Sequence, residues 1–362
     1  MRIWRWLGIL LALAVLLAFV LGDPVAWGQA TLIMWDVAGG GKRTLWQDLT
    51  DPPPANTSCI GRAARVTSTN PPARAPRRSC WCPAPWCSGA TSRGSRRWLA
   101  LSRGQVSWCW CQSCRKSAGW RCRGPMPTGI ASALEQMYEW RLSQPLGVAA
   151  VSYAVAPAMI AVLQDRLAGK VDFVVGVGGY RDAEAAIRFV TTGSFRPMGE
   201  AREFQVTPNN YGRWAFLRAN AGRLDDRNDR ALLQAIAQAR FRDPGADVAP
   251  LAAKLGPQGQ AVLALVENRD PDAVTLLVSA LPESVRREID GLNLALYDLS
   301  KLKGDLILVP YSESQALAAA ASNAHVSLFL VDDLGHVDFD AVTAANTWTM
   351  WRAILALLQE RH

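Results

Sequence analysis

Acidic residues are missing from a long stretch in the first half of the chain. The 362 residues include 31 Asp and Glu, yet none lies from Pro52 to Leu134, a stretch that holds thirteen Lys and Arg. The formal net charge is +8, and removing those thirteen positive charges leaves 8 − 13 = −5. The basic balance therefore belongs to one stretch. Because that stretch shows no signature of a nucleic-acid-binding fold, no nucleic-acid partner is predicted.

Cysteine is absent outside residues 59–122, where all eight cysteines and six of the fifteen tryptophans lie. The only repeated spacing is Cys-x-Cys, and the three histidines (His325, His336 and His362) are all far away, so a mixed zinc site is not indicated. Helical and strand periodicity are also lacking. Residues 52–128 are therefore predicted to be largely disordered, without a packed core. A metal- or disulfide-organised binding module at Cys59–Cys122 remains the alternative.

The same stretch is typical of a coding sequence translated out of frame. Tryptophan has one codon and cysteine two, so the underlying bases are constrained. Shifted to the third base of each codon, residues 80–89 can be read as Leu-Val-Pro-Gly-Thr-Val-Val-Leu-Gly, and residues 108–113 begin as Val-Leu-Val-Pro. Both segments are strand-like. We therefore interpret residues from about 58 to 128 as out of frame, a hypothesis that the coding DNA would settle.

The amino end lacks acidic residues and carries a long apolar run. Arg2 and Arg5 precede seventeen uncharged residues, Trp6–Gly22, and Asp23-Pro24 ends the run. This pattern predicts an export segment within residues 1–28, favoured as an uncleaved inner-membrane anchor with the basic end inside and the body outside. A cleaved signal peptide is the alternative. The predicted location is the cell envelope, either inner-membrane anchored or periplasmic.

A lone serine lies between an apolar strand pattern and an apolar helix pattern. The strand is predicted at 146–151, Ser152 follows it, and Tyr153–Ala168 has the pattern of a helix. With the small residues Ala150 and Ala154 around it, Ser152 resembles the nucleophile elbow of the α/β-hydrolase superfamily, in which glycines usually hold those two positions. The alternative is a serine that caps an ordinary buried helix.

The rest of the chain predicts an α/β fold with a mainly parallel sheet flanked by helices, similar to an incomplete α/β-hydrolase. A mainly helical region at about 209–289 interrupts the strands and is interpreted as a cap insertion. Within it, Arg213-Trp214 and the charged run 225–230 are expected at the surface. The predicted domains are the segment 1–28, the mostly irregular segment 29–128 and the hydrolase-like domain 129–362. The predicted strands are 146–151, 172–177, 305–309 and 326–331.

The resemblance also implies catalytic roles. His336 follows the last predicted strand, where the family places its catalytic histidine, and the backbone amide of Tyr153 corresponds to one oxyanion donor. The catalytic acid is missing, because the chain passes from Leu306–Val309 directly to Pro310 without the acid-bearing segment that the family usually has. Glu313 is the nearest substitute. Asp332, Asp333 and Asp338 also lie near His336 in the sequence, and Asp182 is more consistent with a helix cap than with an acid.

The sequence therefore predicts a serine hydrolase-like envelope protein whose parent hydrolyses an ester or related acyl bond. The resemblance implies a small acyl or ester substrate and no metal or organic cofactor. Because the acid and the segment for a second oxyanion donor are missing, activity is predicted to be impaired. The alternative is a non-catalytic envelope scaffold or partner-binding protein that retains the fold.

Overall fold

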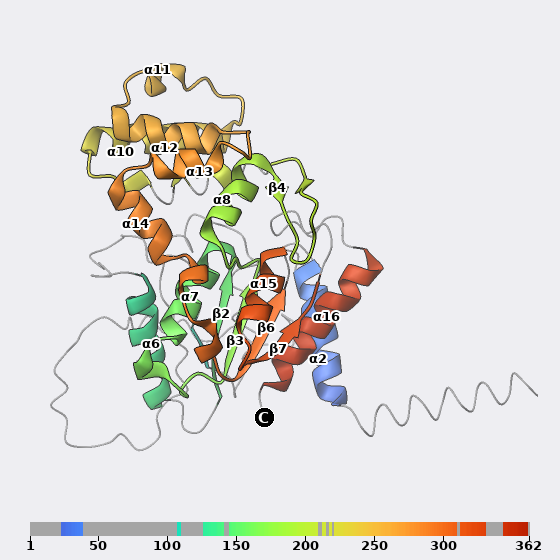
Figure 1. The fold of residues 1–362 in the computed structure, drawn as a ribbon. Helices are drawn as coiled ribbons and strands as arrows, with labels where there is room; N and C mark the ends of the chain where they lie inside the picture. The colour runs from blue at the N-terminus through green and yellow to red at the C-terminus, as the bar shows by residue number, and fades with distance from the viewer. Residues whose placement is uncertain are drawn as a thin grey trace, which may run out of the picture.

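The structure is a computed structural model that describes residues 23–38, 107–109, 126–140, 145–208, 212–214, 217–218, 221–309, 312–330 and 343–360. A parallel sheet forms its centre (Figure 1). Its strands are β1 (Ser107–Cys109), β2 (Leu146–Val151), β3 (Phe173–Val177), β6 (Asp305–Val309) and β7 (His325–Leu328). Helices cover both faces, so the predicted α/β class is confirmed.

The strands stand in the order β1-β2-β3-β6-β7, and each neighbouring pair is parallel. The four predicted strands are confirmed within a few residues. The strand β1 is a correction, because it lies within the segment that we expected to be disordered. Its residue Ser107 pairs with Leu146 at the start of β2. Strand pairing is driven by backbone hydrogen bonds, which an unpatterned side-chain sequence does not reveal.

One face of the sheet packs on α6 (Met126–Trp140), α7 (Val155–Val162) and α15 (Ser312–Ala320). Alternating strand residues point to it, among them Val148, Val174 and Leu306, each at most 4% exposed. The helix α6 begins at Met126. The predicted domain boundary at residue 129 therefore falls inside a packed helix.

The opposite face packs on α16 (Ala344–Gln359), which α2 (Pro24–Ala38) covers in turn. Figure 1 shows α2 in blue and α16 in red, side by side. Phe173 and Ile307 point from the sheet to α16, and Ile33 of α2 packs with Ile354 of α16. The expectation that residues 29–128 are mostly irregular is thus wrong for 29–38. Asp23-Pro24 begins a new helix there as well as ending the apolar run.

The helical insertion has a hydrophobic core of its own, which includes Leu233 and Ile236 at 0% exposure. The described part contains short helical pieces at 212–214 and 217–218. Figure 1 shows this unit beyond α8 (Ala183–Thr192), at one end of the sheet. The insertion predicted at about 209–289 is therefore present as a separate helical layer. Its helices are α10 (Arg227–Arg242), α11 (Ala249–Ala252), α12 (Pro257–Glu267), α13 (Val274–Ser279) and α14 (Glu283–Gly291).

The surface prediction for Arg213-Trp214 is wrong, and that for the charged run 225–230 is wrong at Asp229, whereas residues 225–228 are exposed as predicted. Arg213 and Trp214 are 3% and 4% exposed, because the Arg213 guanidinium lies over the Trp214 ring at 5.4 Å and donates to the Val266 carbonyl. Asp229 is 1% exposed, and its carboxylate accepts hydrogen bonds from the amides of Gly256 and Gly259, both at 2.7 Å. These amides begin α12, whose positive helix end stabilises the buried carboxylate.

The remaining elements are short. A hairpin of β4 (Ser194–Phe195) and β5 (Phe204–Gln205) forms a separate antiparallel sheet after α8. Among the described helices, none is long and apolar enough to cross a membrane. Residues 1–22, which carry the predicted export segment, lie outside the described residues. The single-turn helices are η2 (Ser152–Ala154), η3 (Asp165–Leu167), η4 (Ala221–Arg223), η5 (Leu294–Leu296) and η6 (Leu299–Lys301).

Candidate active site

Ser152 occupies a sharp turn between β2 and α7. Val151 is still extended, with φ −124° and ψ 136°, whereas Ser152 has φ 54° and opens the 3₁₀ turn η2. Ser152 is the one non-glycine residue with positive φ in the part of the chain that the structure describes. For an L-residue this conformation costs about 1–2 kcal/mol. The backbone therefore has the strand, strained serine and helix that the elbow resemblance predicts.

The helix-cap alternative for Ser152 does not match this geometry. An N-cap serine has an extended backbone and lies directly before the helix. Here Val151 precedes η2, Ala154 precedes α7, and neither position carries a side-chain cap. Ser152 lies inside the turn with a half-buried side chain. Its strain is thus not explained by capping, and strained non-glycine residues cluster at functional sites.

Two glycines, Gly176 and Gly179, lie against the first residue of the helix that follows the turn. Ala150 pairs with Gly176 of β3. A Cβ atom at Gly176 would lie 3.2 Å from Val155 Cγ1, and one at Gly179 would lie 2.6 Å from the same atom. The first residue of α7 therefore packs directly on a glycine surface formed by β3 and the loop after it. The sequence around Ser152 did not indicate this packing.

The two candidate acids at this edge that the structure describes are engaged by backbone amides. Asp182 caps α8 and accepts from Glu184 N at 2.8 Å and Ala185 N at 3.3 Å, as its sequence position indicated. Glu313 Oε2 accepts from Arg181 N at 3.1 Å and Asp182 N at 3.0 Å. Glu313, the predicted substitute acid, thus ties the start of α15 to the loop after β3.

His336 lies outside the described residues, together with Asp332, Asp333 and Asp338. The structure describes the chain as far as residue 330, just after β7. Parallel strands end at one edge of a sheet, so the carboxyl ends of β2 and β7, which precede Ser152 and His336 in the sequence, lie at the same edge. The approach of Ser152 and His336 stays a prediction, as does the oxyanion role of the Tyr153 amide.

Two tyrosines, Tyr153 and Tyr180, lie near each other beside the turn, which the sequence did not indicate. Burial raises the pKa of Tyr180 far above its usual range, and nearby Tyr153 and Glu288 raise it further. Tyr153 follows the turn serine, Tyr180 follows β3, and Glu288 comes from α14 of the helical unit. These three residues have no spacing in common, so only the fold brings them together. Because of this raised pKa, the Tyr180 phenol stays neutral at ordinary pH values.

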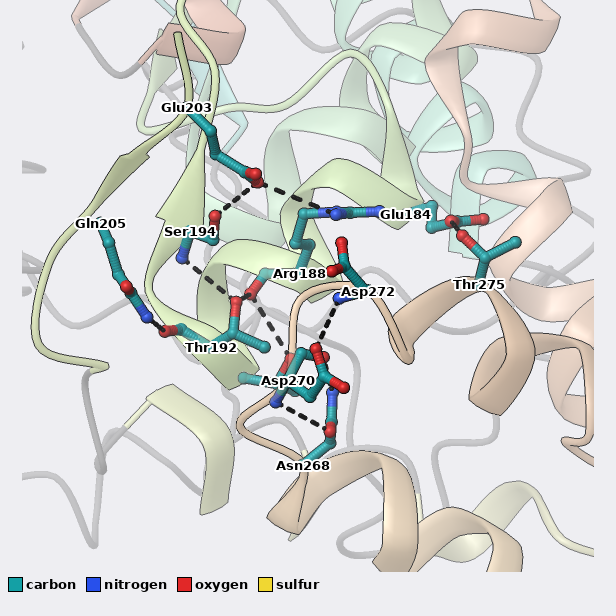
Figure 2. A network of polar contacts seen from close by, with 11 residues as sticks. Glu184, Arg188, Thr192, Ser194, Glu203, Gln205, Asn268, Asp270, Asp272 and Thr275 are labelled. Carbon is teal, nitrogen blue, oxygen red and sulfur yellow. Dashed lines mark hydrogen bonds and ion pairs between the residues drawn. The ribbon is translucent and has the colours of Figure 1, made fainter.

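The helix α8 fastens the helical unit and the β4–β5 hairpin to the sheet. Figure 2 shows the polar contacts at this junction. Glu203 of the hairpin accepts from Ser194 Oγ at 2.5 Å and pairs with Arg188 at 3.8 Å. From the helical unit, Thr275 donates to Glu184, and Arg269 donates to the Thr191 carbonyl at 2.8 Å. The start and the end of α8 are therefore tied to the helical unit, and Arg188 in its middle is tied to the hairpin that follows it.

Comparisons with known proteins identify no family for this chain. No family model and no curated protein sequence matches it. Among solved structures, it is similar to the rice cell wall degrading esterase LipA from Xanthomonas oryzae, with TM-score 0.35 and 13% identity over 63% of this chain. The chain spans 61% of the length of that esterase chain. Nothing about activity follows from a likeness at this score.

The described residues contain no group of three or more His, Cys, Asp or Glu that is placed to hold a metal ion. Most of the cysteine-rich stretch lies outside them. The hypothesis of a metal- or disulfide-organised module there is thus not tested by the structure.

Proposed function

We propose that this chain is a serine hydrolase-like protein of the cell envelope, related to the α/β-hydrolase superfamily, with impaired activity. The observation that carries the proposal is the backbone of Ser152, which has φ 54° at the end of a central parallel strand and just before a buried helix. Such a turn exposes a serine hydroxyl above the sheet and leaves the next amide beside it.

The reaction of the proposed parent enzyme follows from the positions of Ser152, Tyr153 and His336 in the chain. The Ser152 hydroxyl oxygen attacks the carbonyl carbon of an ester or related acyl group while His336 takes the hydroxyl proton. The Tyr153 amide donates to the oxyanion, which collapses as the C–O bond breaks and the leaving alcohol takes the proton from His336. Water then attacks the acyl-serine by the same steps, and the free acid leaves.

Two missing groups, the catalytic acid and one oxyanion donor, are the reason to expect impaired activity. Removal of the acid that orients the histidine costs ~10⁴ in turnover in the serine-protease template. Removal of one oxyanion donor costs ~10²–10³. The two need not multiply, because such groups act as a unit. The Glu313 carboxylate already accepts two backbone hydrogen bonds, which favours its structural role over a catalytic one.

A non-catalytic scaffold is the second candidate. It is favoured by the engagement of Asp182 and Glu313 in backbone contacts, which stabilise the sheet edge without any reaction. In this case the strain at Ser152 is a remnant of an ancestral enzyme. The two candidates differ in what Ser152 does once the missing parts are supplied.

The test of the proposal is the site of covalent labelling. The chain is restored to the alternative frame over residues 58–128, given an acid-bearing loop before Pro310, and treated with a fluorophosphonate. Peptide mass spectrometry is expected to place the adduct on Ser152. The Ser152→Ala variant should lose labelling, whereas the matched Ser279→Ala variant should keep it. A restored chain without any adduct on Ser152 would favour the scaffold.

A further inference from the structure

The outer surfaces of α2 and α16 combine exposed tryptophan with a lack of charge. Trp35 is 64% exposed and Trp348 is 59% exposed. No Asp, Glu, Lys or Arg occurs in residues 24–35 of α2 or in residues 344–351 of α16. By contrast, five of the nine residues of α14 are charged. Exposed helix surfaces are normally polar, and these two uncharged stretches, which end at Asp36 and Arg352, depart from that pattern.

The tryptophans form one surface. Trp348 and Trp351 stack with ring centroids 4.9 Å apart and an interplanar angle of 10°. The indole N–H of Trp351 donates to Thr31 Oγ1 at 3.1 Å, which joins the two helices. Trp35 lies one turn beyond Thr31 on the same side of α2. We name Trp35, Trp348 and Trp351 the tryptophan face.

The chain itself indicates the partner of this face. The apolar run Trp6–Gly22 ends one residue before Asp23, which caps α2 by accepting from Val25 N at 3.0 Å and Ala26 N at 2.9 Å. The Asp23 side chain therefore starts α2 as a new helix, which need not continue the direction of the preceding segment. Its 15 residues span about 22 Å, enough to lie along a surface.

We propose that the tryptophan face docks on a phospholipid bilayer, with α2 lying in the interface next to the membrane segment. Indole rings favour this zone because they have an apolar body and one N–H donor. The face holds the hydrolase-like body against the membrane in one orientation. The inference rests on the proposed envelope location and membrane segment, and it is independent of the chemistry at Ser152.

Photo-crosslinking of the full chain tests this contact. p-Benzoylphenylalanine replaces Trp35 or Trp348 in separate variants, and Leu276 or Leu296 in matched controls that are 72% and 66% exposed. Each variant is reconstituted in vesicles of phosphatidylethanolamine and phosphatidylglycerol, irradiated and digested. Phospholipid adducts are expected at positions 35 and 348, with yields at least about fivefold above those of both controls.

Every other pattern overturns the proposal. Equal lipid yields at all four positions would show no preferred orientation. Adducts from positions 35 and 348 to residues 6–22 would show that the chain covers its own face, and adducts to a second copy would show a dimer interface. The absence of any adduct at positions 35 and 348 would also contradict a bilayer contact. Because crosslinking does not use Ser152, a failed hydrolase hypothesis leaves this result interpretable.

Discussion

At the scale of single residues, the strain at Ser152 has a measurable cost. Glycine adopts φ 54° without the clash of a Cβ atom, whereas alanine retains the clash. We expect Ser152→Gly to exceed Ser152→Ala in free energy of unfolding by about 1 kcal/mol, measured by urea denaturation. Both variants lack the hydroxyl, so the comparison isolates the backbone. A Gly variant no more stable than the Ala variant would contradict the strained turn.

Glu360 gives a prediction for pH dependence. The pKa of Glu360 is raised to about 7, mainly by burial and also by Asp305 and Asp172, whereas His325 opposes the change. The folded protein therefore binds this proton more tightly than the unfolded chain, whose Glu titrates near the ordinary value of 4.5. The free energy of unfolding falls as pH rises between these two values, because over this range the folded state holds a proton that the unfolded chain has already released.

The Glu360→Gln variant removes this titration. We expect wild-type stability to fall relative to that of the variant from pH 5 to pH 7, and the difference to level off above pH 8. Urea denaturation at several pH values measures it. A constant difference between the two proteins across this range would contradict the raised pKa of Glu360.

At the scale of elements, Glu313 joins two loops at the sheet edge. Loss of its charge weakens the hydrogen bonds to Arg181 N and Asp182 N. We expect Glu313→Gln to lower the free energy of unfolding by about 1–2 kcal/mol. The matched variant Glu283→Gln, which breaks an exposed pair with Arg287, should change it by less than about 0.5 kcal/mol. Equal effects of the two variants would show that Glu313 does not tie the loops together.

The buried Asp229 carboxylate holds α10 to α12. We expect Asp229→Asn to speed amide exchange at Gly256 and Gly259 and to destabilise the helical unit by about 1–3 kcal/mol, because amide oxygens accept more weakly and the Asn NH₂ lacks an acceptor there. The exposed Asp247, which caps α11, provides the control Asp247→Asn. Exchange at Gly256 and Gly259 that is unchanged in the Asp229→Asn variant would contradict this contact.

Much of the element pattern was predictable from the sequence, and the exceptions have physical causes. Central strands such as Phe173–Val177 are nearly all apolar, since both faces are covered, so their position is plain. Arg213 and Trp214 were expected at the surface because charge usually indicates exposure, but cation–π contact and the Val266 carbonyl make burial possible. The helix α2 was missed because Pro24 marks a helix start as readily as a stop.

The site was only partly predictable. The turn at Ser152 follows from local sequence, since an apolar strand, a serine and an apolar helix are adjacent. The surroundings of that turn do not, because Gly176 and Tyr180 come from β3 and the loop after it, whereas Glu288 comes from α14. Their approach depends on strand order and on the packing of α14. Long-range placement of this kind leaves no periodic signal in the sequence.

At the scale of the whole molecule, hydrophobic cores lie on both faces of the central sheet and within the helical unit. The strand β1 retains a three-residue pairing with β2 even in the stretch interpreted as out of frame. The central hypothesis is therefore that a hydrolase fold persists after essential parts of its catalytic apparatus have been lost.

Hydrolysis of a p-nitrophenyl ester tests that hypothesis most directly. The proteins compared are this chain, its Ser152→Ala variant, the chain restored in frame and acid loop, and the restored chain with Ser152→Ala. We expect the first two to be equally inactive or nearly so, and the restored chain to gain at least ~10² in turnover, all of it dependent on Ser152. A correctly folded restored chain that remains inert would contradict the hydrolase assignment. Robust Ser152-dependent turnover by the unrepaired chain would contradict the loss of its catalytic apparatus.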